Sequence, residues 1–225
     1  PQQITNIWQQ VVTQKSVSAL PFDENCWQFV YRLRLANSMK LEGVSADFSE
    51  AGLLASMDVW LLPYLNNITS WAQLSQLNFI GQLKSLLDYS EQQILNKQLP
   101  ESLPLPSGRN SRLHYCAPQI HGSEGSEPNN TKVTLSVRMQ ELYGLQQHPS
   151  VNQGKLAVTI ELLSPAQRPL QTTQDLPGFW QGSYKEVQKE MKGRYPRHFW
   201  PDDPANSQAT TTTKKRMLNN EQNRA

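Results

Sequence analysis

The chain is poor in cysteine, and its two cysteines lie far apart. Cys26 and Cys116 form no C-x-x-C pair, which argues against a disulfide framework and against a Cys-rich zinc site. His114, Cys116 and His121 lack a fourth ligand at a helpful spacing, so we expect no metal site. Because unpaired cysteines are typical of a reducing compartment, we expect a cytoplasmic location.

Long hydrophobic runs are also missing. Hydrophobic residues make up 37% of the 225 residues, which suggests that some stretches lie outside any core. No apolar run approaches the roughly 20 residues that a membrane span needs, so we expect no membrane partner.

The motifs of several enzyme classes are absent as well. No G-x-S-x-G elbow is present. The pair Gly154-Lys155 is followed by Leu156, and Pro149 stands where a phosphate-binding loop needs its first glycine. Asp202 and Asp203 read as a solvated turn between prolines. We therefore expect no catalytic residue in this chain and no ATP hydrolysis by the chain alone.

Residues 1–98 carry a helical pattern. Ile4, Ile7, Trp8 and Val11 follow the i, i+3, i+4, i+7 spacing of an apolar helical stripe. Serines suited to N-caps precede three further segments, at Ser49, Ser70 and Ser90. We predict a helical bundle domain over residues 1–98.

A proline-rich segment at 99–108 marks a boundary, after which the apolar period becomes two. This alternation predicts strands at 133–137 and 156–162, and further strands in "SGRNSRLHYC" and "RPLQTTQ". The polar stretch "QIHGSEGSEPNNTK" reads as a surface loop. We predict an α+β protein whose second domain, 99–204, is β-rich; closure into an OB-like barrel stays open.

The second domain should end in one helix. Asp175 can cap it, and Trp180, Tyr184, Val187 and Met191 form its apolar stripe before Gly193. Residues 205–225 lack apolar periodicity and are predicted to be a disordered basic tail.

Positive charge gathers at the C-terminal end. Residues 177–225 hold nine Lys and Arg against five Asp and Glu, although the whole chain has a net charge of only +2. Such cations suit the phosphates of a nucleic acid. The candidate nucleic-acid-binding residues are Lys185, Lys189, Lys192, Arg194, Arg197, Arg109, Arg112 and Arg138. A solvated helix face would show the same lysine stripe, so this alternative stays open.

The stretch "KGRYPRHFWPDDP" at 192–204 combines cations, aromatic rings and prolines. Its rings suit either stacking on unpaired bases or clamping the last helix onto its own domain. We favour the clamp, with Arg194 and Arg197 as RNA contacts. The candidate clamp residues are Trp180, Tyr184, Tyr195, Phe199 and Trp200.

Several long motifs resemble a known family. "LPSGRNSRLHY", "VRMQELYGL", "LLSPAQRPLQTTQDLPGFW", "SYKEVQKEMKGRYPRHFWPDDP" and "TKKR" occur in the order seen in the C-terminal region of the bacterial ATP-dependent helicase HrpB family. "LLASMDVWLLPYL" is similar to the helical stretch that precedes this region. The resemblance covers residues from about 22 to 216.

The resemblance implies a DExH-type, RNA-dependent NTPase as the parent, with two RecA-like motor lobes upstream of this chain. ATP and magnesium would belong to those lobes, and no cofactor is implied for this fragment. Two interpretations of the fragment stay open. It either binds RNA, single-stranded more readily than paired, or it docks on the motor lobes or another protein without touching nucleic acid.

Overall fold

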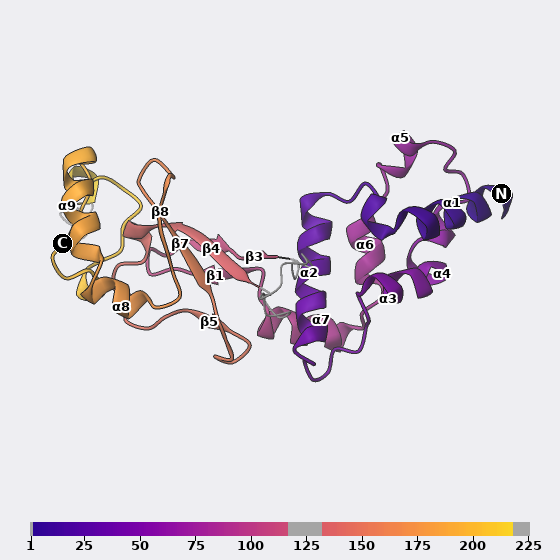
Figure 1. Ribbon diagram of the computed structural model, residues 1–225, viewed down its shortest axis with the longest axis horizontal. Coiled ribbons are helices and arrows are strands. Elements are labelled where there is room, and N and C mark those ends of the chain that lie inside the picture. Colours follow the sequence, from indigo (N-terminus) through magenta and orange to yellow (C-terminus); the bar gives the residue numbers. More distant parts are fainter. Residues whose placement is uncertain (1, 117–131, 218–225) are drawn as a thin grey trace, which may run out of the picture. The chain divides into compact units, whose positions relative to one another are not determined.

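The computed structural model describes residues 2–116 and 132–217 (Figure 1). Contacts divide the chain into two units. The first comprises residues 1–99 and 115–131, and the second comprises 100–114 and 132–225. The boundary expected from the sequence lies after residue 98, and the return of the chain to the first unit at Tyr115 has no counterpart in the sequence pattern. The polar loop expected from Gln119 onward falls almost entirely outside the described residues, as does His121.

The first unit is helical in its described part (Figure 1). Its elements are α1 (Gln2–Lys15), η1 (Val17–Ala19), α2 (Glu24–Ser38), α3 (Glu50–Ala55), α4 (Met57–Trp60), η2 (Leu62–Tyr64), α5 (Trp71–Leu74), α6 (Phe79–Lys84) and α7 (Tyr89–Gln98). Among the residues whose structure is described, no helix has the length and apolar character that a bilayer crossing requires.

Side-chain caps explain where these helices begin. The predicted caps Ser49 and Ser70 are confirmed, because they accept hydrogen bonds from the backbone N–H groups of Gly52 and Gln73. The cap expected at Ser90 is wrong. Asp88 starts α7 instead, in a capping box with Glu91, because the carboxylate two residues upstream captures the N–H of Glu91 first.

The core of the first unit is built around α2. Leu33, Leu53, Trp60 and Leu83 are fully buried, and the indole of Trp60 donates to the carbonyl of Leu53 at 2.9 Å. Burial of side chains from α2, α3, α4 and α6 supplies the main driving force for the fold of this unit.

The second unit combines strands with two closing helices, so the predicted α+β class is confirmed. Its strands are β1 (Ser102–Pro104), β2 (Asn110–Arg112), β3 (His114–Tyr115, whose second residue is counted with the first unit), β4 (Val133–Arg138), β5 (Ser150–Val151), β6 (Leu156–Ala157), β7 (Thr159–Leu163) and β8 (Pro169–Thr173). A short helix η3 (Met139–Glu141) follows β4.

A four-stranded sheet in the order β3-β4-β7-β8 forms the centre of this unit (Figure 1). β4 pairs with β7 in parallel, and β7 pairs with β8 in antiparallel. Every second residue of β4 is buried, as its alternating sequence predicts. β1 pairs with β2, and β5 with β6, in separate ladders, so hydrogen bonding among the described strands does not close a barrel.

The closing helix differs from its prediction. Two helices, α8 (Leu176–Gln181) and α9 (Tyr184–Arg194), replace the single helix expected from Asp175 onward, so that prediction is wrong. Asp175 caps α8 as expected. Gly182 lies between the helices with φ −109° and ψ −98°, outside the helical region, which breaks the run.

The segment 205–217 is ordered against the second unit, whereas a disordered tail was predicted from residue 205. The backbone N–H of Thr210 donates to the carbonyl of Gln140 at 2.9 Å, and Thr210 is buried. The side-chain amide of Gln146 donates to Asn206 at 2.8 Å. Polar hydrogen bonds of this kind leave no apolar period, so the sequence pattern did not reveal them. Residues 218–225 lie outside the described part.

Candidate nucleic-acid interface

The C-terminal strap, residues 195–204, is fastened to the second unit by aromatic side chains that donate to backbone carbonyls. The hydroxyl of Tyr184 donates to Pro201 at 2.8 Å, and the indole of Trp200 donates to Tyr195 at 3.1 Å. The hydroxyl of Tyr143 reaches the carbonyl of Phe199 at 3.3 Å. The bonds of Tyr184 and Tyr143 hold the strap against α9 and the segment after β4, while the Trp200 bond joins two residues within the strap.

The rings themselves form one cluster. Trp180 contacts Tyr184 edge to face at 5.4 Å between ring centroids, and both contact Tyr143, which also meets Phe199. Trp180, Tyr184 and Trp200 are buried, while Tyr195 and Phe199 are half-buried. A buried ring has no free face for an incoming base, so Trp180, Tyr184 and Trp200 suit a clamp rather than a stacking platform.

Burial also governs the ionisation of the cluster. It raises the pKa of Tyr184 to about 12, with the nearby Asp202 charge acting in the same direction and hydrogen bonds opposing it. Burial likewise raises the pKa of Tyr143, reinforced by Tyr184. Both phenols therefore remain neutral donors at physiological pH, which keeps the strap bonds intact.

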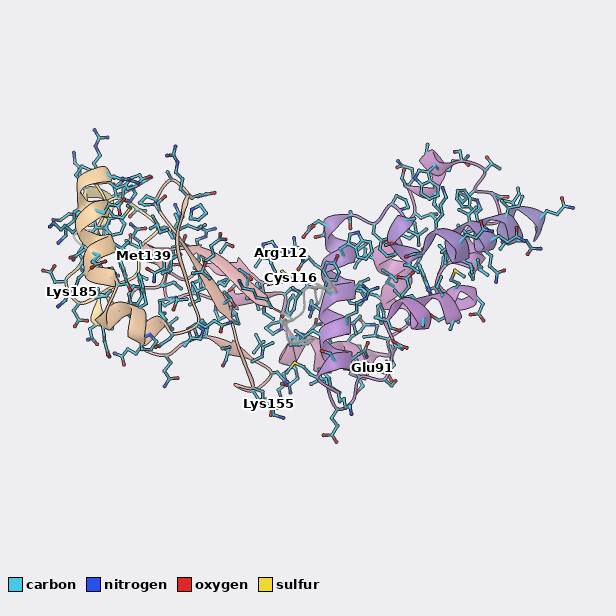
Figure 2. The ribbon with its side chains drawn as sticks, viewed as in Figure 1. Glu91, Arg112, Cys116, Met139, Lys155 and Lys185 are labelled. Atoms are coloured by element: carbon cyan, nitrogen blue, oxygen red, sulfur yellow. The ribbon has the colours of Figure 1, made fainter. Side chains whose placement is uncertain are left out.

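Helix α9 presents the lysines that the sequence singled out. Lys185 and Lys189 are exposed and form no ion pair with any residue in the described part of the chain (Figure 2 labels Lys185). Lys192 pairs with Asp202 at 3.3 Å, and Arg194 pairs with Glu190 at 3.0 Å one turn away. The pKa of Asp202 is lowered by its hydrogen bonds from Gln188 and Lys192.

A further group of cations lies beside the strap. Arg197 is exposed, and its carbonyl accepts the backbone N–H of Lys214 at 2.9 Å. Lys215 and Arg216 follow in sequence and are exposed. The sequence placed these last cations on a free tail, and only the ordered tail brings Lys214 next to Arg197.

The strand-region arginines are arranged differently. Arg109 and Arg138 both approach the carboxylate of Glu141, which is buried. Nε of Arg138 donates to Oε1 at 2.9 Å, and Nη1 of Arg109 lies 3.3 Å from Oε2. Arg112 is exposed on β2 (labelled in Figure 2) and does not line the cavity beside this cluster.

A cavity of about 150 Å³ opens beside the arginine pair. Its lining combines residues of β2, β4, η3 and the turn between β7 and β8: Leu105, Arg109, Asn110, Ser111, Ser136, Val137, Arg138, Glu141, Leu163 and Gln167. No sequence signal pointed to Glu141, because an acidic residue following a strand is common and its partners lie 32 residues and 3 residues away.

No metal centre emerges from the described residues, in which no three His, Cys, Asp or Glu side chains converge. His198 is half-buried, and its pKa is lowered by burial and then by the charge of Arg138. A neutral ring beside Arg138 adds no positive charge near the cavity at physiological pH.

Comparison with known proteins identifies the family to which this chain belongs. The family described as the ATP-dependent helicase C-terminal region, HrpB_C, matches residues 60–204. The ATP-dependent RNA helicase HrpB of Escherichia coli (strain K12) is 41% identical over 204 residues, which are 91% of this chain and 24% of that protein. The chain thus corresponds to the C-terminal region that this helicase family shares.

Solved structures agree with this class. The crystal structure of the E. coli DExH-box NTPase HrpB superposes with a TM-score of 0.78 at 38% identity, covering 91% of this chain and 24% of that one. A second structure, the E. coli DEAH/RHA helicase HrpB, gives a TM-score of 0.66 at 35% identity, covering 85% and 23%. The chain belongs to the HrpB family, and it spans about a quarter of the length of these relatives.

Proposed function

We propose that this chain is an RNA-binding accessory region of a cytoplasmic ATP-dependent RNA helicase. The observation that carries the proposal is the exposed cationic surface of α9 and the strap, where Lys185 and Lys189 have no acidic partner among the described residues. Arg197 and Lys214 add to the positive charge of the same unit. An ammonium group without an intramolecular partner can exchange a counterion for a phosphate, which favours binding to nucleic acid.

Single-stranded RNA is the proposed ligand. The relatives of this chain are described as an ATP-dependent RNA helicase, a DExH-box NTPase and a DEAH/RHA helicase, and an unpaired strand is what a helicase motor handles. With Trp200 buried and Tyr195 and Phe199 half-buried, the proposed contact is mainly electrostatic, so it should show little base preference and a strong salt dependence. ATP and magnesium would be used by the parent's RecA-like motor lobes, and this chain should have no ATPase activity alone.

Fluorescence anisotropy with labelled single-stranded RNA tests the proposal. The double variant Lys185→Glu/Lys189→Glu should bind roughly tenfold more weakly at low salt, and its salt slope should fall by about 1.4, because two phosphate contacts are lost. The matched control is Lys15→Glu/Lys97→Glu, which makes the same charge change at exposed helix positions in the first unit. Equal affinities for the wild type and the α9 variant would exclude this surface.

A second candidate function is docking on the motor lobes. It is favoured by exposed apolar side chains at the N-terminal end of the first unit, where Ile7, Tyr64 and Trp71 are exposed. The ring of Trp71 packs against Trp8 with centroids 5.5 Å apart, which holds it in place. Stable binding of the chain to separately produced motor lobes, abolished by Ile7→Asp, together with no affinity for RNA, would favour docking instead.

A further inference from the structure

We propose that the cavity beside Glu141 binds one phosphate group of an unpaired RNA backbone, with Arg109 and Arg138 as its ligands. This inference rests on the proposed function and adds a second, sheet-side contact to the α9 surface. Both sites lie in the second unit.

The arginine pair carries more positive charge than its partner neutralises. Two guanidinium groups share the single carboxylate of Glu141, which leaves these three side chains with a net charge of +1. Only Nη1 of Arg109 and Nε of Arg138 are engaged with Glu141. The remaining N–H groups of both arginines make no hydrogen bond with the described residues. They are donors available to an anion.

The buried position of Glu141 explains why the guanidinium groups of Arg109 and Arg138 are oriented before a ligand binds. Its carboxylate is buried, with a side-chain exposure of 5%, whereas Arg109 is 58% exposed. A buried acid of this kind is weak support for stability, because desolvation offsets much of the Coulomb attraction. It does fix the orientation of both guanidinium groups, and a preorganised donor loses less conformational freedom when a ligand binds.

The rest of the lining favours an acceptor-rich ligand. Ser111 and the side-chain amides of Asn110 and Gln167 add hydrogen-bond donors. Glu141 already accepts from both arginines and, at 3.4 Å, from Ser107. The carboxylate of Glu161 also accepts a hydrogen bond, from the hydroxyl of Ser136 at 2.5 Å. The two carboxylates are therefore engaged internally, while guanidinium N–H groups remain and the amide and hydroxyl groups can offer further donors, which suits an oxyanion.

The size of the cavity limits the ligand to one small group. Its volume of about 150 Å³ lies below the roughly 300 Å³ at which pockets for drug-sized molecules begin. A phosphate group fits such a space, and buried Leu105 and Val137 close its inner side. Free phosphate presents the same group, and the membership of the chain in a helicase family selects the RNA backbone as its source.

RNA binding by single-site variants of the 225-residue chain tests the inference. Arg109→Ala should weaken binding of labelled single-stranded RNA roughly 3- to 10-fold and lower the salt slope by about 0.7, which corresponds to one contact. Since Arg138 still pairs with Glu141 in this variant, the fold should persist, which near-UV circular dichroism checks. The matched control is Lys155→Ala, a lost cation at the exposed β5–β6 turn of the same unit (Figure 2).

A second variant, Glu141→Gln, should change the RNA affinity in the opposite direction. Glu141→Gln keeps an oxygen that accepts from Arg138 but raises the net charge of the group formed by Arg109, Arg138 and residue 141 from +1 to +2, so RNA affinity should rise about 2- to 5-fold. A purely structural role for the cluster predicts no gain. Unchanged affinity in both Arg109→Ala and Glu141→Gln, with the Lys185→Glu/Lys189→Glu variant still defective, overturns the cavity site and leaves the proposed function intact.

Inorganic phosphate separates the two proposals further. Titration with phosphate should shift the Nε–Hε NMR signals of Arg109 and Arg138, and Lys185→Glu/Lys189→Glu should not change this response. If phosphate shifts these signals but RNA does not bind, the cavity is an oxyanion site and its assignment to an RNA backbone is wrong. If phosphate leaves both signals unmoved, the inference fails whatever the α9 surface does.

Discussion

The side-chain amide of Gln28 and the backbone of Tyr115 form a reciprocal pair of hydrogen bonds. Tyr115 N–H donates to Oε1 of Gln28 at 2.8 Å, and Nε2 of Gln28 donates to the carbonyl of Tyr115 at 3.2 Å. One turn further along α2, Arg32 donates to the carbonyl of Leu99 at 2.9 and 2.7 Å. Helix α2 therefore holds both points at which the chain leaves and re-enters the first unit.

Replacing Gln28 should destabilise the first unit. Gln28→Ala leaves the buried N–H and carbonyl of Tyr115 without these partners, and we expect the free energy of unfolding to fall by about 2 kcal/mol. Urea titration followed by tryptophan fluorescence measures the change. Gln93→Ala, at an exposed position of α7, is the control and should be within about 0.5 kcal/mol of the wild type. Equal stabilities of the two variants would show that the pair contributes little.

The strap depends on Trp200. This ring is buried, so Trp200→Ala should lower the free energy of unfolding of the second unit by about 3 kcal/mol or more. Trp71→Ala makes the same substitution where the ring is 44% exposed, and it should cost far less. Amide hydrogen exchange reports the result, because α9 and the strap should lose protection first. Unchanged protection in Trp200→Ala would contradict the clamp.

The two thiols should react at very different rates. Burial, then the hydrogen bond and charge of Asp23, raises the pKa of Cys26 to about 12, whereas Cys116 is exposed. The thiolate is the reactive species, so a disulfide reagent at pH 8 should modify Cys116 quickly and Cys26 only after unfolding. The absorbance of the released thiolate follows both phases. Cys116→Ser should remove the fast phase, and a fast phase of two thiols would contradict the burial of Cys26.

Glu91 should make stability depend on acid pH. Burial opposes ionisation of this carboxyl, but hydrogen bonds from Ser45 and the backbone N–H of Asp88 prevail and lower its pKa (Figure 2 labels Glu91). A pKa lowered by folding stabilises the fold above the unfolded value of about 4.3, and this contribution is lost as pH falls through the folded pKa.

Glu91→Gln therefore should be less stable than the wild type at pH 7 by about 1 kcal/mol, as for a lost capping interaction. The difference should shrink as the pH falls from about 5 to 3, because the wild-type carboxyl becomes protonated. Thermal unfolding over this pH range measures it. Glu42→Gln, at an exposed glutamate, should follow the wild-type curve. A difference that stays constant with pH would rule out the charge as its source.

Local patterns predicted much of the secondary structure. Ser49 and Ser70 were identified as caps because their side chains act on residues three positions away. The alternation in β4 and β7 predicted their buried faces, since a strand turns successive side chains to opposite sides. The prediction of a single C-terminal helix failed at Gly182, where the helix is interrupted. The apolar stripe continues from α8 into α9, so the sequence pattern did not reveal the interruption.

The candidate site was predicted residue by residue but not as a site. The count of charged residues singled out Lys185 and Lys189, but the sequence does not show whether an exposed lysine forms an ion pair with an acidic side chain. Arg109 and Arg138 were chosen for their charge alone, and their shared partner Glu141 was not foreseen. Ordering of the tail, which brings Lys214 to Arg197, was likewise missed.

The sequence by itself determined the α+β class, the helix starts at Ser49, Ser70 and Asp175 and the HrpB family, because caps, periodicity and long motifs are properties of neighbouring residues. Only the tertiary structure decided which cations are free and which are already paired. It also decided that Tyr115 returns to α2 and that two arginines meet one buried carboxylate. The contact of Arg109 with Glu141 joins residues 32 positions apart, and the contact of Gln28 with Tyr115 joins residues 87 positions apart. Burial and hydrogen bonding establish such contacts only when the chain folds.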